Sequence, residues 1–136
     1  MLYKKIFYLL AVTFFSEMVW AAEDLYYAVD DQGLNNSQFF IISPDLSVNH
    51  LGSVRKGADI EGLDVDPLDG KIYVSSGDDT DNPGYLYWVD PTNGFPVRIG
   101  AIKTDEHHFK EVDGLSFRPS DYTLWGWAQG EGLLTY

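Results

Sequence analysis

Two carboxylates, Glu61 and Asp113, stand directly before a Gly-Leu pair and are separated by 52 positions. Carboxylate oxygens that converge form a hard site suited to Ca²⁺ or another divalent cation. We therefore expect Glu61 and Asp113 to be metal ligands if the fold brings them together. The alternative is that both side chains cap turns or accept hydrogen bonds from neighbouring backbone amides.

Other acidic stretches have simpler structural interpretations. The segment 64–70 (DVDPLDG) lacks the spacing of a calcium loop and predicts an Asp-Pro turn that closes with a glycine. The segment 78–82 (DDTDN) could chelate a cation, but a solvated loop of mutually repelling charges is the favoured interpretation.

Histidine and tryptophan pairs are the remaining candidates for chemistry. His107 and His108 are adjacent, so on a strand they would point to opposite faces and could not bind one ion; we interpret them as loop residues. Trp125 and Trp127 alternate around a glycine and therefore share one strand face. We expect them to pack between neighbouring repeats, with stacking on a sugar as the alternative.

Comparison of the chain with itself predicts tandem repeats. An offset of 52 places 61–74 (EGLDVDPLDGKIYV) on 113–126 (DGLSFRPSDYTLWG) without a gap. An offset of 48 pairs 51–54 (LGSV) with 99–102 (IGAI). The same offset of 48 places 132–136 (GLLTY) on 84–88 (GYLYW). Three copies in a consistent order indicate a repeat of about fifty residues.

Short runs rich in Tyr, Ile, Val, Phe and Trp, bounded by turn-forming residues, predict an all-β protein. The expected strands cover 25–29, 39–43, 71–75, 85–89, 97–102 and 123–128. Four short antiparallel strands in one repeat are typical of a β-propeller blade, and such blades bury their faces by stacking around an axis. A β-sandwich is the alternative fold.

The expected domain is incomplete. Residues 22–136 hold about two and a third blades, whereas a closed propeller needs about four or more. The chain also stops inside an expected strand, so we predict a truncated product or a fragment of a longer protein. The alternative is self-association through open blade edges.

The first 21 residues predict an exported protein. Lys4 and Lys5 precede the uncharged run 6–15, and small residues near Ala21 suit signal-peptide cleavage. A ten-residue run spans about half of a bilayer core, so we expect no stable membrane span, although an uncleaved N-terminal anchor is the alternative. The expected location is periplasmic or extracellular.

The net charge restricts the classes of possible partner, and the cysteine content restricts how the fold can be stabilised. The net charge of −12 repels nucleic-acid phosphates and anionic lipid headgroups, so cations or basic partners fit better. The absence of Cys excludes disulfides and thiol catalysis, and core packing must therefore hold the fold together.

Residues 61–74 and 84–94 (GYLYWVDPTNG) together resemble the opening blade of gluconolactonase-like, or regucalcin-type, propellers, and are similar to YWTD, NHL and YVTN repeats. The resemblance covers residues 24–136. It implies that Glu61 is a ligand of a catalytic metal and that Asp113 is a second ligand with a catalytic role. That family places an Asn-bearing blade between the two positions, whereas Asp113 here lies in the very next repeat.

Two functions follow as expectations. The first is an exported propeller module, or a fragment of one, with a non-catalytic role in binding a protein or small ligand. The second is a metal-dependent lactonase or esterase of the gluconolactonase type, which would require Ca²⁺ or a similar divalent ion.

Overall fold

The structure, a computed structural model, describes residues 25–33 and 35–135. This part of the chain folds into β-strands joined by turns and loops, without a helix. The strands are β1 (Tyr26–Asp31), β2 (Ser37–Ile42), β3 (Val48–Arg55), β4 (Ile60–Val65), β5 (Ile72–Ser76), β6 (Tyr85–Val89), β7 (Pro96–Ala101), β8 (Val112–Phe117), β9 (Leu124–Ala128) and β10 (Gly132–Thr135). The prediction of an all-β protein is confirmed.

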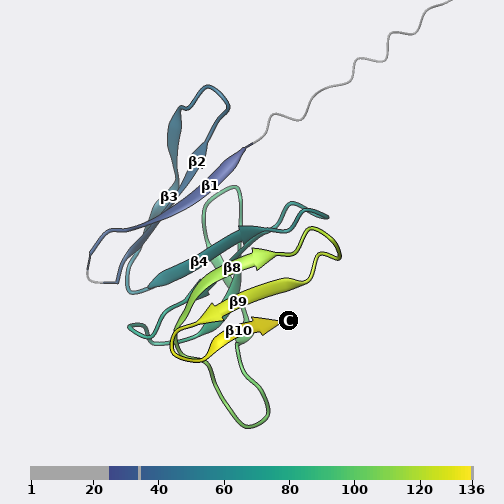
Figure 1. The fold of residues 1–136 in the computed structure, drawn as a ribbon. Coiled ribbons are helices and arrows are strands. Elements are labelled where there is room, and N and C mark those ends of the chain that lie inside the picture. The colour runs from purple at the N-terminus through teal and green to yellow at the C-terminus, as the bar shows by residue number, and fades with distance from the viewer. Residues whose placement is uncertain (1–24, 34, 136) are drawn as a thin grey trace, which may run out of the picture.

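The strands form three antiparallel meanders. The N-terminal sheet has the order β1-β2-β3, the central sheet β4-β5-β6-β7 and the C-terminal sheet β8-β9-β10. Figure 1 shows β8 beside β4, so the first strands of the central and C-terminal sheets are neighbours. The expected four strands per sheet occur only in the central sheet within the described residues.

Two separate hydrophobic clusters hold the three sheets together. The first lies between the N-terminal and central sheets and contains Phe39, Leu51, Ile72, Val74 and Val89. The second lies between the central and C-terminal sheets and contains Ile102, Val112, Leu115, Leu124 and Ala128. Because side chains alternate along a strand, β5 contributes to both clusters. The central sheet is therefore the middle layer of a three-sheet stack.

Asp-Pro turns set the spacing of the strands. The backbone carbonyl of Asp66 accepts a hydrogen bond from Gly70 N at 2.8 Å, and its carboxylate accepts one from Leu68 N at 2.8 Å. Asp90 makes the corresponding bonds to Gly94 N and Thr92 N, each at 2.8 Å. The turn interpretation of 64–70 is thereby confirmed.

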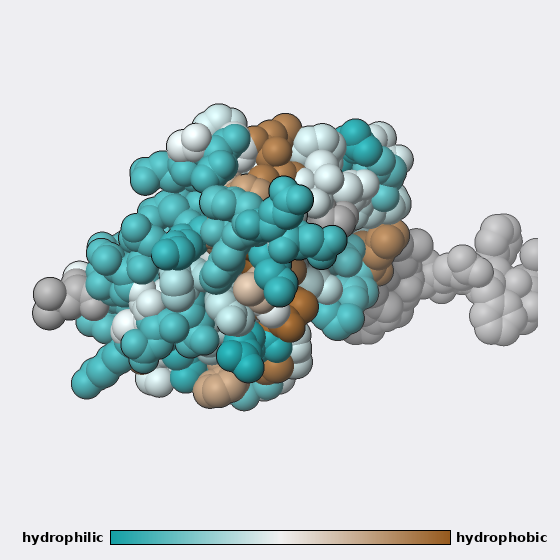
Figure 2. Space-filling model, turned by 90° about the horizontal axis from the view of Figure 1, so that it is seen from below, coloured by the Kyte–Doolittle hydropathy of each residue, from teal (hydrophilic) through white to brown (hydrophobic). Residues whose placement is uncertain are grey.

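The first 21 residues, in which a signal peptide is expected, lie outside the described residues. Within 25–33 and 35–135, no helix has the length and apolar character that crossing a membrane requires. From below the view of Figure 1, hydrophilic side chains cover most of the surface and apolar ones gather in a band across the middle (Figure 2).

Candidate functional site: an acidic rim at the junction of two sheets

Glu61 and Asp113 occupy matching β-bulges. The register of β4 against β5 shifts between Ile60 and Gly62, and the extra residue is Glu61. The register of β8 against β9 shifts in the same way between Val112 and Gly114, and the extra residue is Asp113. A bulge re-aims the side chain that it carries and is enriched beside binding sites. Both sheets thus begin with a re-aimed carboxylate.

The two bulges lie against each other across the junction of the sheets. A Cβ atom built on Gly62 would lie 3.0 Å from Leu115 N and 3.1 Å from the carbonyl carbon of Gly114. Ser75 is the strand partner of Gly62, and its Oγ donates a 2.7 Å hydrogen bond to the carbonyl oxygen of Val112. The structure therefore brings together the segments that carry Glu61 and Asp113.

The environments of the two carboxylates differ. Glu61 is largely exposed, and its pKa is raised first by partial burial and then by the charges of Asp59, Asp113, Asp31 and Asp78. Asp113 is half-buried, and its Oδ1 atom is buried without a hydrogen-bond partner among the described residues. Asp113 thus presents an oxygen that a positively charged group could satisfy.

Further carboxylates surround this pair. Asp59 ends the β3–β4 loop, Asp78 is the second residue of the β5–β6 loop and Glu111 directly precedes β8. The pKa of Glu111 is raised to about 7, first by burial, then by a hydrogen bond with Asp78 and by the charges of Asp78, Asp113 and Glu61. We name this group the acidic rim: it comprises Asp59, Glu61, Asp78, Glu111 and Asp113.

Two members of the rim, Asp59 and Glu111, were not among the candidates predicted from sequence. Asp59 and Glu111 are separated by 52 positions, the same offset that relates Glu61 to Asp113, so the repeat alignment could have found them. Their backbones also act alike: Asp59 O accepts from Gly77 N at 2.7 Å, and Glu111 O accepts from Gln129 N at 3.0 Å. Asp78 was considered only within the segment 78–82, for which a solvated loop was favoured, because its place beside the other carboxylates depends on the path of that loop.

Hydrogen bonds fix that loop against the neighbouring ones. Asp59 Oδ2 accepts from Asp79 N at 2.9 Å, and Thr80 Oγ1 donates to Gly57 O at 2.7 Å. Asn35 Nδ2 donates to Asp79 O at 3.0 Å. The acidic segment 78–82 is therefore tied to the β1–β2 and β3–β4 loops as well as being exposed to solvent.

Two hollows open at the rim, and Asp78 lines both of them. The first has a volume of about 380 Å³ and is lined mainly by polar groups of residues 56–57 and 78–81. The second has a volume of about 290 Å³ and lies between residues 107–111 and the β9–β10 turn. The carboxylates of the rim thus run past two neighbouring depressions, whose linings also include Lys56 in the first and Lys110 in the second.

His107 and His108 lie in the loop beside the second hollow. His107 Nε2 lies 3.1 Å from Glu131 Oε1, whereas the His108 ring packs edge-on against Tyr85 with the ring centres 5.9 Å apart. The two rings therefore make different contacts. Both residues lie between β7 and β8, which confirms their interpretation as loop residues. Within the described residues, no group of three or more His, Asp or Glu side chains has the arrangement of a metal site.

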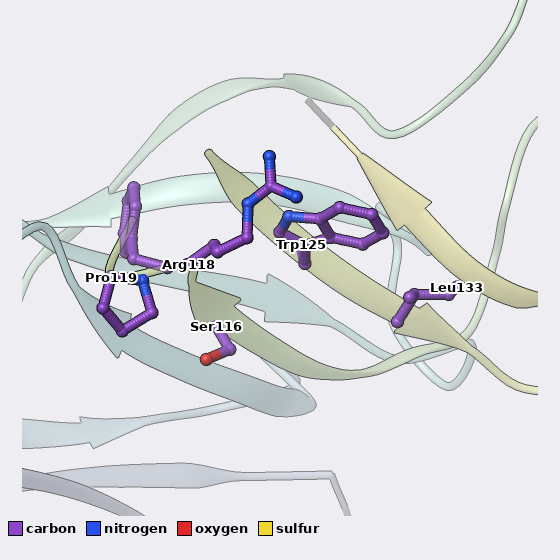
Figure 3. Close-up of a pocket in the computed structure, with 6 residues that line it drawn as sticks. Ser116, Arg118, Pro119, Trp125 and Leu133 are labelled. Carbon is purple, nitrogen blue, oxygen red and sulfur yellow. The ribbon is translucent and has the colours of Figure 1, made fainter. Parts of the chain in front are cut away.

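Trp125 and Trp127 alternate with Leu124 and Ala128 along β9 and therefore share its outer face, on which Figure 3 shows Trp125. Trp127 is 52% exposed, and the expected packing between two repeats is absent there within the described residues. The prediction of packing was wrong for Trp127, whereas Trp125 is half-buried. Leu124 and Ala128, on the other face of β9, are the residues that join the second cluster.

No protein-family model, curated protein or solved structure matches this chain. The geometry of the rim is therefore the basis for assigning a function.

Proposed function

We propose that this protein is an exported β-propeller-type module, or a segment of one, that binds without catalysis and takes a basic segment of a partner protein on its acidic rim. Three features support a propeller-type arrangement. The sheets stack face to face in chain order, and the first strands of consecutive sheets are neighbours. The pair β4–β5 and the pair β8–β9 also have the same lengths, connection and bulge.

The observation that carries the binding role is the row of carboxylates along two adjacent hollows. Because the carboxylates repel one another, the free protein holds them at a free-energy cost that a bound cation would relieve. Asp113 adds a buried oxygen without a hydrogen-bond partner among the described residues. The rim extends over several loops instead of closing on one point, which suits several Lys or Arg side chains along a peptide.

Titration of oligolysine into the protein at low ionic strength tests this proposal. We expect binding that weakens with added salt and weakens about tenfold in the double variant Glu61→Gln/Asp78→Asn, since each lost charge removes a favourable contact. Binding should also strengthen between pH 6 and pH 8, because the pKa of Glu111 is raised to about 7 and its negative charge is gained over that interval.

A matched control distinguishes binding at the rim from attraction to the net negative charge of the protein. Asp45 lies in the β2–β3 turn, outside the rim, so Asp45→Asn removes one charge there and should leave the affinity nearly unchanged. An equal loss of affinity per charge in the rim and control variants would contradict the proposal, because it would mean that oligolysine responds only to net charge.

A metal-dependent lactonase is the second candidate, and the matched bulges of Glu61 and Asp113 favour it. Their oxygen atoms are the hard donors that Ca²⁺ prefers, and Asp113 Oδ1 is buried without a partner among the described residues. A bound Ca²⁺ would polarise a lactone carbonyl. Glu61 and Asp113 supply two carboxylate ligands, so further oxygen ligands would have to come from water, backbone or substrate.

Thermal unfolding with and without Ca²⁺ tests this second candidate. Ca²⁺ at about one hundred times its dissociation constant should add about 2.7 kcal/mol to the free energy of unfolding, and Glu61→Gln should abolish the gain. An unchanged melting temperature in millimolar Ca²⁺, or an equal shift in Glu61→Gln, would reject the metal site at the bulges.

A further inference from the structure

The outer face of the C-terminal sheet carries exposed apolar side chains. Trp127 of β9 and Leu133 of β10 lie opposite each other and are 52% and 63% exposed. Trp125 follows on the same face, and two shallow hollows of about 280 and 210 Å³ share Trp125, Leu133 and Ser116. Figure 3 shows Arg118 and Leu133 on either side of Trp125, and the Arg118 guanidinium carbon lies 5.3 Å from the centre of its ring.

The corresponding face of the central sheet shows what covers a surface of this kind. Tyr73, which precedes Trp125 by 52 positions, packs edge-on against Phe117 with the ring centres 5.6 Å apart. Beside it, Asp64 Oδ2 accepts a 2.6 Å hydrogen bond from Phe117 N. The cover is therefore the opposite face of another sheet, here the C-terminal one.

Within residues 25–33 and 35–135, the stack also has an uncovered apolar surface at its other end. Tyr26, Ile42 and Val48 lie opposite one another across β1, β2 and β3. Their strand neighbours Tyr27 and Ile41 pack against the first cluster, so this row faces away from the central sheet. Tyr26 and Val48 are 61% and 58% exposed. We name this surface the N-terminal outer face, and the one with Trp127 the C-terminal outer face.

The two outer faces are opposite sides of one repeating stack. The central sheet packs one of its faces on the N-terminal sheet and receives the C-terminal sheet on the other. Each layer therefore presents one face to the preceding sheet and its other face to the following sheet. The N-terminal outer face therefore corresponds to the face that packs on a preceding sheet. The C-terminal outer face corresponds to the face on which a following sheet packs.

We propose that the C-terminal outer face binds the N-terminal outer face of a second copy of this chain, so that copies associate head to tail. Such a contact continues the packing that already joins the central and C-terminal sheets. It buries Trp127 and Leu133 of one copy against Tyr26 and Val48 of the next. Because the two surfaces differ, the contact is heterologous and repeats until the copies form a closed ring or an extended filament.

Sedimentation of the purified protein over a range of concentrations measures this association. Trp127→Asp on one face and Tyr26→Asp on the other should each weaken self-association at least about tenfold, because a charge would be buried in an apolar contact. Leu133→Asp provides a second variant of the C-terminal face. Leu68→Asp is the matched control: Leu68 is 68% exposed in the β4–β5 turn, away from both faces, and its replacement should leave association unchanged.

Mixing the two face variants gives the sharpest test. The Trp127→Asp variant keeps an intact N-terminal outer face, and the Tyr26→Asp variant keeps an intact C-terminal outer face. Each should be monomeric alone, whereas an equimolar mixture should form a dimer that grows no further. A wild-type protein that stays monomeric at all concentrations would overturn the proposal, as would a mixture of the variants without dimers. Rings and filaments of the wild type both support it.

Discussion

The central sheet and the C-terminal sheet begin with the same pair of strands, displaced by 52 positions and bulged at the same place. Their surroundings differ, because the central sheet is covered on both faces and the C-terminal sheet on one within the described residues. Matching positions therefore have different neighbours. The comparison shows that similar local sequences give the same strands and turns in both sheets, whereas the packing partner determines how much a substitution destabilises the fold.

The largest expected contrast comes from placing a charge in each sheet. Val74 is fully buried in the first cluster, so Val74→Asp should cost about 4 kcal/mol or more and prevent folding at ordinary temperatures. Trp127→Asp in the half-covered sheet should cost less than about 1 kcal/mol, because Trp127 is 52% exposed. Chemical denaturation of both variants, at protein concentrations at which the wild type is monomeric, checks the contrast. A similar cost for the two would mean that Trp127 is covered within the monomer.

Glycines at the paired bulges give the next contrast. A Cβ on Gly62 would collide with Ser75 Oγ and press against the backbone of the C-terminal sheet, so Gly62→Ala should destabilise by about 2 kcal/mol. At Gly114 the nearest atom to a new Cβ is Trp127 Cβ at 3.9 Å, and Gly114→Ala should change stability by less than about 0.5 kcal/mol. Equal urea midpoints for the two variants would show that the sheets are not packed through Gly62.

A smaller contrast concerns the hydrogen bond between the two sheets. Asp64→Ala removes the acceptor of the 2.6 Å bond from Phe117 N and should cost about 1 kcal/mol, because that donor would be left only partly buried. Ser116 follows Asp64 by 52 positions but is exposed, and Ser116→Ala should be nearly neutral. Hydrogen exchange of the Phe117 amide provides a second measurement: its protection should fall in Asp64→Ala and persist in Ser116→Ala.

Much of the fold was predictable from sequence because strands and turns are locally encoded. The aromatic run 85–89 coincides with β6, and the Asp-Pro turns close as expected around Gly70 and Gly94. The shared Gly-Leu context also predicted that Glu61 and Asp113 lie in corresponding places. These features depend on residues that are close together in the chain, which is why composition and spacing reveal them.

The bulges, the extent of the rim and the exposure of Trp127 were not predictable in the same way. A register shift depends on how two strands pair, and the residue types at Glu61 and Asp113 do not predict it. Asp78 reaches the rim because Asp79 N bonds to Asp59 across 20 positions. Trp127 occupies the predicted strand face, but its cover depends on what lies beyond the sheet. Each of these properties arises from contacts between distant segments.

The smallest expected effect concerns the loop ends of the two sheets, where Asp59 and Glu111 occupy matching positions. The folded-state pKa of Glu111 is about 7, above the ordinary value of 4.5, so the folded protein binds this proton more tightly than the unfolded chain. The contribution of Glu111 to stability is therefore fully present below about pH 4.5 and is lost as the pH rises through about 7.

Glu111→Gln removes this titration, and it should raise the melting temperature slightly at pH 8 relative to the wild type while leaving it nearly unchanged at pH 4.5. Thermal unfolding of both proteins across this interval measures the difference. Glu106→Gln, which removes an exposed carboxylate from the same β7–β8 loop, should give curves parallel to the wild type. A constant offset between Glu111→Gln and the wild type at every pH would contradict the raised pKa, because it would mean that the substitution acts through packing and not through the charges of the rim.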